Sequence, residues 1–212
     1  MKPKVTVIDY GAGNLHSAAN AFLQLGAEAE LVDEAQDIER AQCLVLPGVG
    51  AFGEGMAGLR RRGLVEPLRA YAASGRPFLG ICLGAQLLME ESEEFGWHQG
   101  LGIVPGQVRL LSQDGVKVPH VGWRRIYPAS AGAWAGTLLA QTPVETWTYF
   151  VHSYQCVPAE ARFACALAAY GPHTITAAVR SGAVIGVQFH PEKSGAFGLS
   201  MLDTWLKSAL PL

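Results

Sequence analysis

One cysteine stands between two glycines in the segment 78–88, which reads FLGICLGAQLL. Cys82 follows an apolar run typical of a buried strand and precedes a helix-like stretch, with Gly80 and Gly84 two positions away on either side. This spacing is typical of a nucleophile elbow, a tight strand-to-helix turn that needs small neighbours. At the start of a helix, free backbone N–H groups favour a thiolate and can bind an oxyanion. The alternative is that Cys82 packs in the core as a small apolar side chain.

The segment 186–192, GVQFHPE, contains the proton carrier that a thiolate nucleophile needs. His190 and Glu192 are two positions apart, so in an extended segment the carboxylate can orient the imidazole and stabilise its charged form. The alternative is an exposed histidine beside an exposed glutamate. None of the other histidines has a carboxylate two positions away. An elbow cysteine followed by a His-x-Glu pair therefore favours a catalytic triad of Cys82, His190 and Glu192.

The elements that must position these residues alternate between strand and helix in the first half of the chain. Continuous apolar runs predict parallel strands, buried on both faces, at 4–9, 41–46 and 78–81. Apolar residues at helical spacing predict helices at 16–25, before the stop signal Gly26, and within 56–74. This alternation predicts an open, mostly parallel α/β sheet flanked by helices.

The second half has shorter strands separated by glycine, proline and serine. It predicts strands at 104–111, 147–152 and 184–189 and a last helix at 198–209. We expect these strands to form a mixed or antiparallel extension of the sheet. No linker or repeat interrupts the sequence, so residues 1–212 are expected to form a single domain.

Three glycine-rich corners fall at the carboxyl ends of predicted strands, where sites form in open α/β sheets. They are GAGN at 11–14, PGVG at 47–50 and the cysteine corner at 80–84. The first does not complete a GxGxxG fingerprint and by itself is more typical of a tight turn.

Composition narrows the classes of function. The formal net charge is −2, without a basic patch, because the run Arg60, Arg61, Arg62 is typical of a solvated helix face. We therefore expect no nucleic-acid or membrane partner. The chain opens on a strand pattern rather than a signal peptide, so a cytoplasmic location is expected. Four scattered cysteines predict neither disulfides nor a zinc site, and we expect no metal and no cofactor.

These motifs together resemble the class I (triad) glutamine amidotransferases, which have a flavodoxin-like fold. GICLGAQLL and QFHPEKSG carry the resemblance to the class. PGVGAF, PHVGW and FVHSY are similar to the glutaminase subunits of imidazole glycerol phosphate synthase, a branch of that class. The resemblance extends over nearly the whole chain, with the motifs in the family's order.

The resemblance implies that Cys82 attacks the side-chain amide carbon of glutamine. His190 would protonate the departing ammonia and activate the water that hydrolyses the thioester, with Glu192 orienting the ring. It also implies an oxyanion hole at the backbone of Leu83 and of 47–50, where the peptide at Val49 would turn before its N–H faces the oxyanion.

The resemblance further implies a binding site for the substrate glutamine. Its residues would be Gly50, Gln86, His152, Ser153 and Tyr154. Without the resemblance, His152 and Tyr154 would be interpreted as ordinary strand residues.

Ammonia released into water would be protonated and lost, so this mechanism implies a second active site. The resemblance places it in a separate cyclase subunit, which is a (β/α)8 barrel and forms a heterodimer with the glutaminase in histidine biosynthesis. The residues expected at or near that interface are Gly11, Gly13, Asn14, Pro119, His120, Trp123 and Lys193. Arg124 stands where relatives often have asparagine, which concerns local interface contacts and not the triad.

Three alternatives remain open from the sequence. The chain could be an amidotransferase subunit that serves another acceptor. It could be a cysteine hydrolase acting on a different amide or ester, or a non-catalytic binding module with Cys82 in its core.

Overall fold

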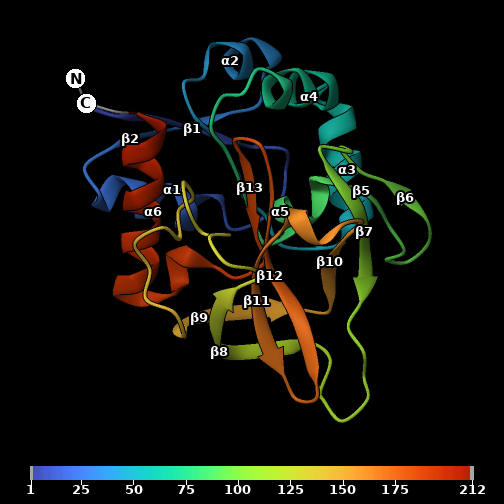
Figure 1. Cartoon of the computed structure of the whole chain (residues 1–212). Helices are drawn as coiled ribbons and strands as arrows, with labels where there is room; N and C mark the ends of the chain where they lie inside the picture. Colours follow the sequence, from blue (N-terminus) through green and yellow to red (C-terminus); the bar gives the residue numbers. More distant parts are fainter. Residues whose placement is uncertain (1, 211–212) are drawn as a thin grey trace.

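The computed structural model describes residues 2–210, and within them nine strands form the main sheet, in the order β2-β1-β3-β4-β13-β12-β11-β8-β9. The pairs from β2 to β13 are parallel, and those from β13 to β9 are antiparallel. The strands are β1 (Lys4–Ile8), β2 (Glu28–Val32), β3 (Leu44–Leu46), β4 (Phe78–Ile81), β8 (His120–Pro128), β9 (Thr146–His152), β11 (Ala164–Tyr170), β12 (His173–Ser181) and β13 (Val184–Val187). The predicted parallel sheet with an antiparallel extension is confirmed (Figure 1).

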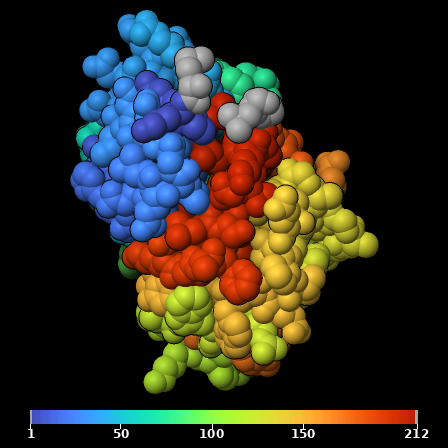
Figure 2. Space-filling model, turned by 90° about the vertical axis from the view of Figure 1, so that its left-hand side faces the viewer, coloured from blue at the N-terminus to red at the C-terminus, as the bar shows by residue number. Residues whose placement is uncertain are grey.

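Helices cover both faces of the parallel half. On one face lie α1 (Leu15–Gln24) and α6 (Gly195–Ala209), which meet where the ring centroids of Phe22 and Trp205 are 5.7 Å apart. The opposite face is covered by α2 (Ala35–Arg40), α3 (Phe52–Arg61), α4 (Val65–Ala73) and α5 (Leu83–Leu87). Figure 2 shows the outer face of α6 between the N-terminal segments and the segment around residues 130–150. Two separate apolar cores follow from this arrangement.

A smaller sheet packs beyond α5. It consists of β10 (Tyr154–Pro158), β7 (Val104–Leu110), β5 (Met89–Ser92) and β6 (His98–Gln99), in that order. Short 3-10 turns, η1 (Ala161–Phe163) and η2 (Pro191–Lys193), complete the described elements. No helix in residues 2–210 is long and apolar enough to cross a membrane.

Several predicted boundaries differ from the structure. The segment 56–74 forms two helices, α3 and α4, because the chain turns at Gly63 in the left-handed region, at φ +66°. Strand β3 starts only at Leu44, since Ala41 closes the short helix α2. Strand β13 ends at Val187 and α6 begins at Gly195, three residues before the predicted start.

Close backbone packing holds the turn between β4 and α5. A Cβ on Gly84 would lie 1.7 Å from the carbonyl oxygen of Leu46 in β3, and one on Gly80 would lie 2.9 Å from the amide nitrogen of Ala85. Only glycine permits these approaches. They place Cys82 at the carboxyl end of β4, level with the end of β3.

Replacing Gly84 with alanine tests this constraint. We expect Gly84→Ala to lower the free energy of unfolding by about 3 kcal/mol, because the added methyl group overlaps a backbone carbonyl. Urea denaturation measures the change. Gly13→Ala is the control, since its Cβ would meet only the Val49 side chain, at 3.1 Å, which is exposed and can move. Equal stability of the two variants would contradict the packing argument.

Candidate active site

Cys82 lies at the turn that joins β4 to α5. Its backbone has φ +54° and ψ −107°, a conformation that non-glycine residues rarely adopt. The strained turn is held by hydrogen bonds, in which Cys82 N–H donates to the Val187 carbonyl at 2.8 Å and Gln86 N–H donates to the Cys82 carbonyl at 3.2 Å. Such strain at a turn after a buried strand is typical of a nucleophile elbow, as the glycine spacing predicts.

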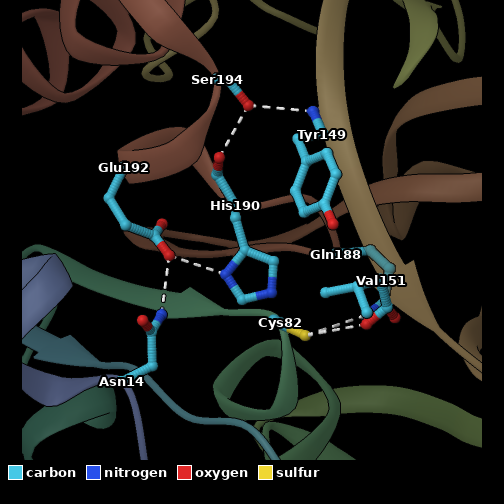
Figure 3. A network of polar contacts seen from close by, with 8 residues as sticks. All are labelled: Asn14, Cys82, Tyr149, Val151, Gln188, His190, Glu192 and Ser194. Atoms are coloured by element: carbon cyan, nitrogen blue, oxygen red, sulfur yellow. Dashed lines mark hydrogen bonds and ion pairs between the residues drawn. The ribbon is translucent and has the colours of Figure 1, made fainter. Parts of the chain in front are cut away.

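His190 and Glu192 follow β13 and meet as a buried ion pair. His190 Nδ1 lies 2.7 Å from Glu192 Oε1, and both side chains are fully buried. Asn14 Nδ2 donates to the same carboxylate oxygen at 2.8 Å. In Figure 3 the imidazole lies between the Glu192 carboxylate and Cys82. The three predicted triad residues are therefore brought together, in the order of a nucleophile, a proton carrier and an orienting carboxylate.

The backbone of His190 is also fixed. Ser194 Oγ donates to the His190 carbonyl at 2.7 Å and accepts from the Tyr149 N–H at 3.0 Å. His190 N–H donates to the Tyr149 carbonyl at 2.9 Å. Strand β9 and the start of α6 therefore hold the imidazole in position.

The charges around His190 determine its protonation. Burial lowers the pKa of this imidazole, but Cys82 and Glu192 outweigh burial and raise the pKa to about 9. Burial raises the pKa of Glu192, but hydrogen bonds from His190 and Asn14 outweigh it and lower the pKa. His190 Nε2 is buried and has no hydrogen-bond partner in residues 2–210. At neutral pH the ring is thus protonated, with Nε2 free to exchange a proton with a reacting group.

The segment 47–50 lies beside the elbow, and one of its carbonyl groups accepts a hydrogen bond from a backbone N–H group of the elbow. Leu83 N–H donates to the Gly48 carbonyl at 3.3 Å. Tyr10 Oη donates to the Pro47 carbonyl at 2.8 Å, and a Cβ on Gly48 would lie 2.0 Å from that hydroxyl. In this structure the Gly48 carbonyl, and not the Val49 N–H, points to the predicted oxyanion hole.

A pocket of about 240 Å³ opens at the elbow. Apart from Pro47 and Gly48, the residues predicted for the oxyanion hole and for glutamine binding line it together with Cys82 and two further residues, Glu94 and Val151. The lining residues are Val49, Gly50, Cys82, Leu83, Gln86, Glu94, Val151, His152, Ser153 and Tyr154. Larger hollows elsewhere, such as one of about 340 Å³ beside Arg60 and Arg69, have no cysteine among their lining residues.

Sequence reasoning missed Glu94 and Gln188. The Glu94 carboxylate accepts from the Phe52 N–H at 2.6 Å at the rim of the pocket, but in the sequence it belongs to the acidic run EESEE, which gives no signal. Gln188 Nε2 lies 3.8 Å from Cys82 Sγ. A signal for Gln188 did exist, because a buried amide side chain directly follows the apolar strand β13.

The residues predicted for a partner interface fall into two groups. The exposed ones are Gly11, Gly13, Pro119, Trp123 and Lys193. Asn14 is half-buried against Glu192, and the side chain of His120 is fully buried behind the exposed residues of its strand, so a place near the interface stays a prediction for both. The position of His120 on β8 alternates with the exposed Val121 and Trp123, which turns the histidine inward.

Arg124, the departure from the family pattern, lies on the same strand. Its guanidinium donates to the Trp123 carbonyl at 2.7 Å and lies 5.0 Å from the centroid of the Tyr170 ring. Its contacts are therefore made within the sheet extension and do not reach the triad.

Comparison with known proteins agrees with this geometry. The family model described as glutamine amidotransferase class-I matches residues 6–208. The chain is 43% identical to imidazole glycerol phosphate synthase subunit HisH 1 of Legionella pneumophila (strain Lens), covering 96% of this chain and 98% of that protein. It is 44% identical to subunit HisH of Synechococcus sp. (strain JA-2-3B'a(2-13)), covering 96% and 92%.

Solved structures share the fold at low sequence identity. PurLQS from Thermotoga maritima matches with a TM-score of 0.74 and 20% identity, covering 98% of this chain and 99% of that chain. A glutamine amidotransferase from Thermotoga maritima matches with a TM-score of 0.66 and 14% identity, covering 100% of both chains. With a class-I model spanning nearly the whole sequence and HisH relatives above 40% identity, the chain belongs to the glutamine amidotransferase class-I family, within the branch of the HisH subunits.

Proposed function

We propose that this chain is the glutaminase subunit of an imidazole glycerol phosphate synthase, acting as a single amidotransferase domain in histidine biosynthesis. One observation carries the proposal: in a chain of the HisH branch, the imidazole of the buried pair His190 and Glu192 lies between the carboxylate and Cys82, which lines a pocket (Figure 3). The reaction converts glutamine and water to glutamate and ammonia.

The triad can perform this reaction in two steps. The Cys82 sulfur attacks the side-chain amide carbon, and the protonated Nε2 of His190 gives its proton to the departing ammonia, which leaves a thioester on the sulfur. Neutral His190 then removes a proton from water, whose oxygen attacks the thioester and releases glutamate. Glu192 holds the Nδ1 proton throughout, so that Nε2 keeps facing the reacting atoms.

The oxyanion hole requires the peptide between Gly48 and Val49 to rotate. Rotation would replace the Gly48 carbonyl by the Val49 N–H and would free the Leu83 N–H, so that both could donate to the oxyanion. The Tyr10 hydroxyl anchors the preceding Pro47 carbonyl, and Gly50 has φ +118°. The rotation can therefore stay confined to one peptide between a fixed point and a glycine.

The pocket contains both uncharged hydrogen-bonding groups and a carboxylate, and glutamine can use both. Gln86 and the backbone of 152–154 supply amide and carbonyl groups, and the Glu94 carboxylate suits the α-ammonium group of an amino acid. The pocket is thus matched to a small polar zwitterion.

The ammonia would pass to a (β/α)8 cyclase subunit in a heterodimer. Val121 and Trp123 of β8 and Phe197 of α6 are large apolar side chains that stay exposed in the described chain. Exposed aromatic side chains are enriched at protein interfaces. We also propose that the complex works in the cytoplasm, where the free cysteines of residues 2–210 would stay reduced.

Replacing the nucleophile gives the first test. We expect Cys82→Ser to reduce glutamine hydrolysis at least about a thousandfold, because a hydroxyl is a far weaker nucleophile beside His190. Circular dichroism and gel filtration with the cyclase should stay unchanged. Retained glutaminase activity would leave Cys82 as a core residue of a binding module.

The protonation of His190 gives the second test. We expect Cys82→Ala to lower the pKa of His190 from about 9, because Cys82 is one of the groups that raise it. Titration of the imidazole by NMR measures the shift. The raised pKa also affects stability. Because folding favours the protonated form of His190, this residue stabilises the wild-type fold fully at a pH below about 6.5, and the contribution is lost as the pH rises to about 9. An unchanged pKa would show that sulfur and imidazole do not interact.

The partner gives the third test. We expect glutamate production to rise sharply when the cyclase and its nucleotide substrate are added to the full chain. A coupled glutamate assay, with and without each component, measures the effect. Co-purification with a protein other than a barrel cyclase would assign the chain to another acceptor pathway, and turnover of other amides or esters instead of glutamine would favour a general cysteine hydrolase.

A further inference from the structure

Two buried histidines outside the triad form a hydrogen-bonded pair that the proposed mechanism does not use. His120 Nδ1 on β8 lies 3.0 Å from His152 Nε2 on the paired strand β9. His120 is fully buried, between Tyr170, at 4.0 Å between ring centroids, and Phe150, at 5.1 Å. Burying two imidazoles without a counter-ion is costly unless they satisfy specific hydrogen bonds.

The Tyr154 carbonyl determines which atom donates in each hydrogen bond of the His120–His152 pair. His152 Nδ1 lies 2.8 Å from the Tyr154 carbonyl oxygen, which can only accept, so Nδ1 carries the proton. Burial is the largest cause that lowers the pKa of His152, to about 4, and that of His120, to about 3, so both rings are neutral at neutral pH. His152 Nε2 is then an acceptor, and His120 must donate to it from Nδ1. His120 Nε2 then carries no proton and is a buried acceptor without a partner in the described chain.

The pair ends on a carbonyl that also holds a pocket residue. The Tyr154 carbonyl accepts a second hydrogen bond, from Gln86 Nε2 at 2.8 Å. Gln86 Nε2 also lies 3.0 Å from Gln188 Oε1, and Gln188 Nε2 lies 3.8 Å from Cys82 Sγ. A continuous series of polar contacts therefore runs from His120 to the nucleophile, and the wall of the pocket at 152–154 is part of it.

We infer that His120 is a positioning residue for glutamine binding: its Nδ1–H holds His152, and His152 in turn holds the Tyr154 carbonyl that orients Gln86. The inference rests on the proposed function, since it concerns the same pocket. His120 touches neither the pocket nor the triad, so its effect is on the placement of groups that bind substrate. Loss of the donor leaves His152 Nε2 as a buried acceptor without a partner and frees the ring to turn away from Tyr154.

The test is steady-state glutamine hydrolysis by the full chain with the cyclase and its nucleotide. His120→Phe keeps the stacking against Tyr170 and Phe150 but removes the donor, and it should raise KM for glutamine about tenfold with kcat nearly unchanged. His120→Asn can place an N–H near the Nδ1 position, and it should restore KM to within about threefold of wild type. Phe150→Leu is the control, because it disturbs the same aromatic cluster without removing a hydrogen bond. It should lower Tm and leave KM unchanged.

Two results would overturn the inference while leaving the proposed function intact. One is an unchanged KM in His120→Phe, and the other is an equal rise of KM in His120→Phe and Phe150→Leu. If the variants do not fold, ¹⁵N NMR of the wild type decides: we expect Nδ1 to carry the proton in both rings, and a proton on His120 Nε2 would overturn the inference. A wild-type chain that does not hydrolyse glutamine would instead overturn the proposed function.

Discussion

The close approach of α5 to β3 is the constraint on which the site depends. Gly84 packs against the Leu46 carbonyl so tightly that no side chain fits between them. This packing forces the chain to turn within the few residues around Cys82, which accounts for the left-handed backbone at the cysteine. The strain is carried by buried apolar elements on both sides, β4 and α5. The same apolar run that looks like core in the sequence therefore brings one buried thiol to the wall of the pocket.

The buried ion pair of His190 and Glu192 depends on hydrogen bonds from several other segments of the chain. Taking His190 and Glu192 out of water is costly, and the cost is offset only when their polar atoms find partners. Asn14 comes from the loop before α1, and Ser194 and Tyr149 fix the backbone from α6 and β9. Segments from both ends of the sequence thus meet at one imidazole, which explains why a His-x-Glu pair so far from the cysteine can serve it.

The features that could be predicted from the sequence are those that depend on neighbouring residues, such as a buried strand and a tight turn. The run 78–81 is apolar on both faces and has the bounds of β4, and the glycines around Cys82 mark the turn. Strand β2 was missed because this edge strand, EAELV, is mostly exposed and carries charges. Gln188 contacts the cysteine from a segment near the end of the chain, and Glu94 reaches the pocket from the loop after β5. The polar Gln188 stands out after an apolar strand, but no local pattern predicts that either residue lies beside Cys82. The orientation of the Gly48 carbonyl depends on how the backbone packs, and the residue types of the segment do not predict it.

The inward position of the His120 side chain could have been predicted from the sequence. In HVGWRRIYP, Val121, Trp123 and Arg125 alternate with residues on the other face, so an outward Trp123 requires an inward His120. Three residues on two segments near the implied partner interface each make a hydrogen bond toward the site. Asn14 reaches Glu192, Tyr10 beside the 11–14 corner holds Pro47, and His120 behind Trp123 holds His152. A partner bound to this face would therefore press on segments that are tied to the carboxylate, the oxyanion segment and the glutamine pocket. Because each tie is a directional hydrogen bond in a buried setting, small displacements of the surface segments change the geometry of the site more than flexible contacts would.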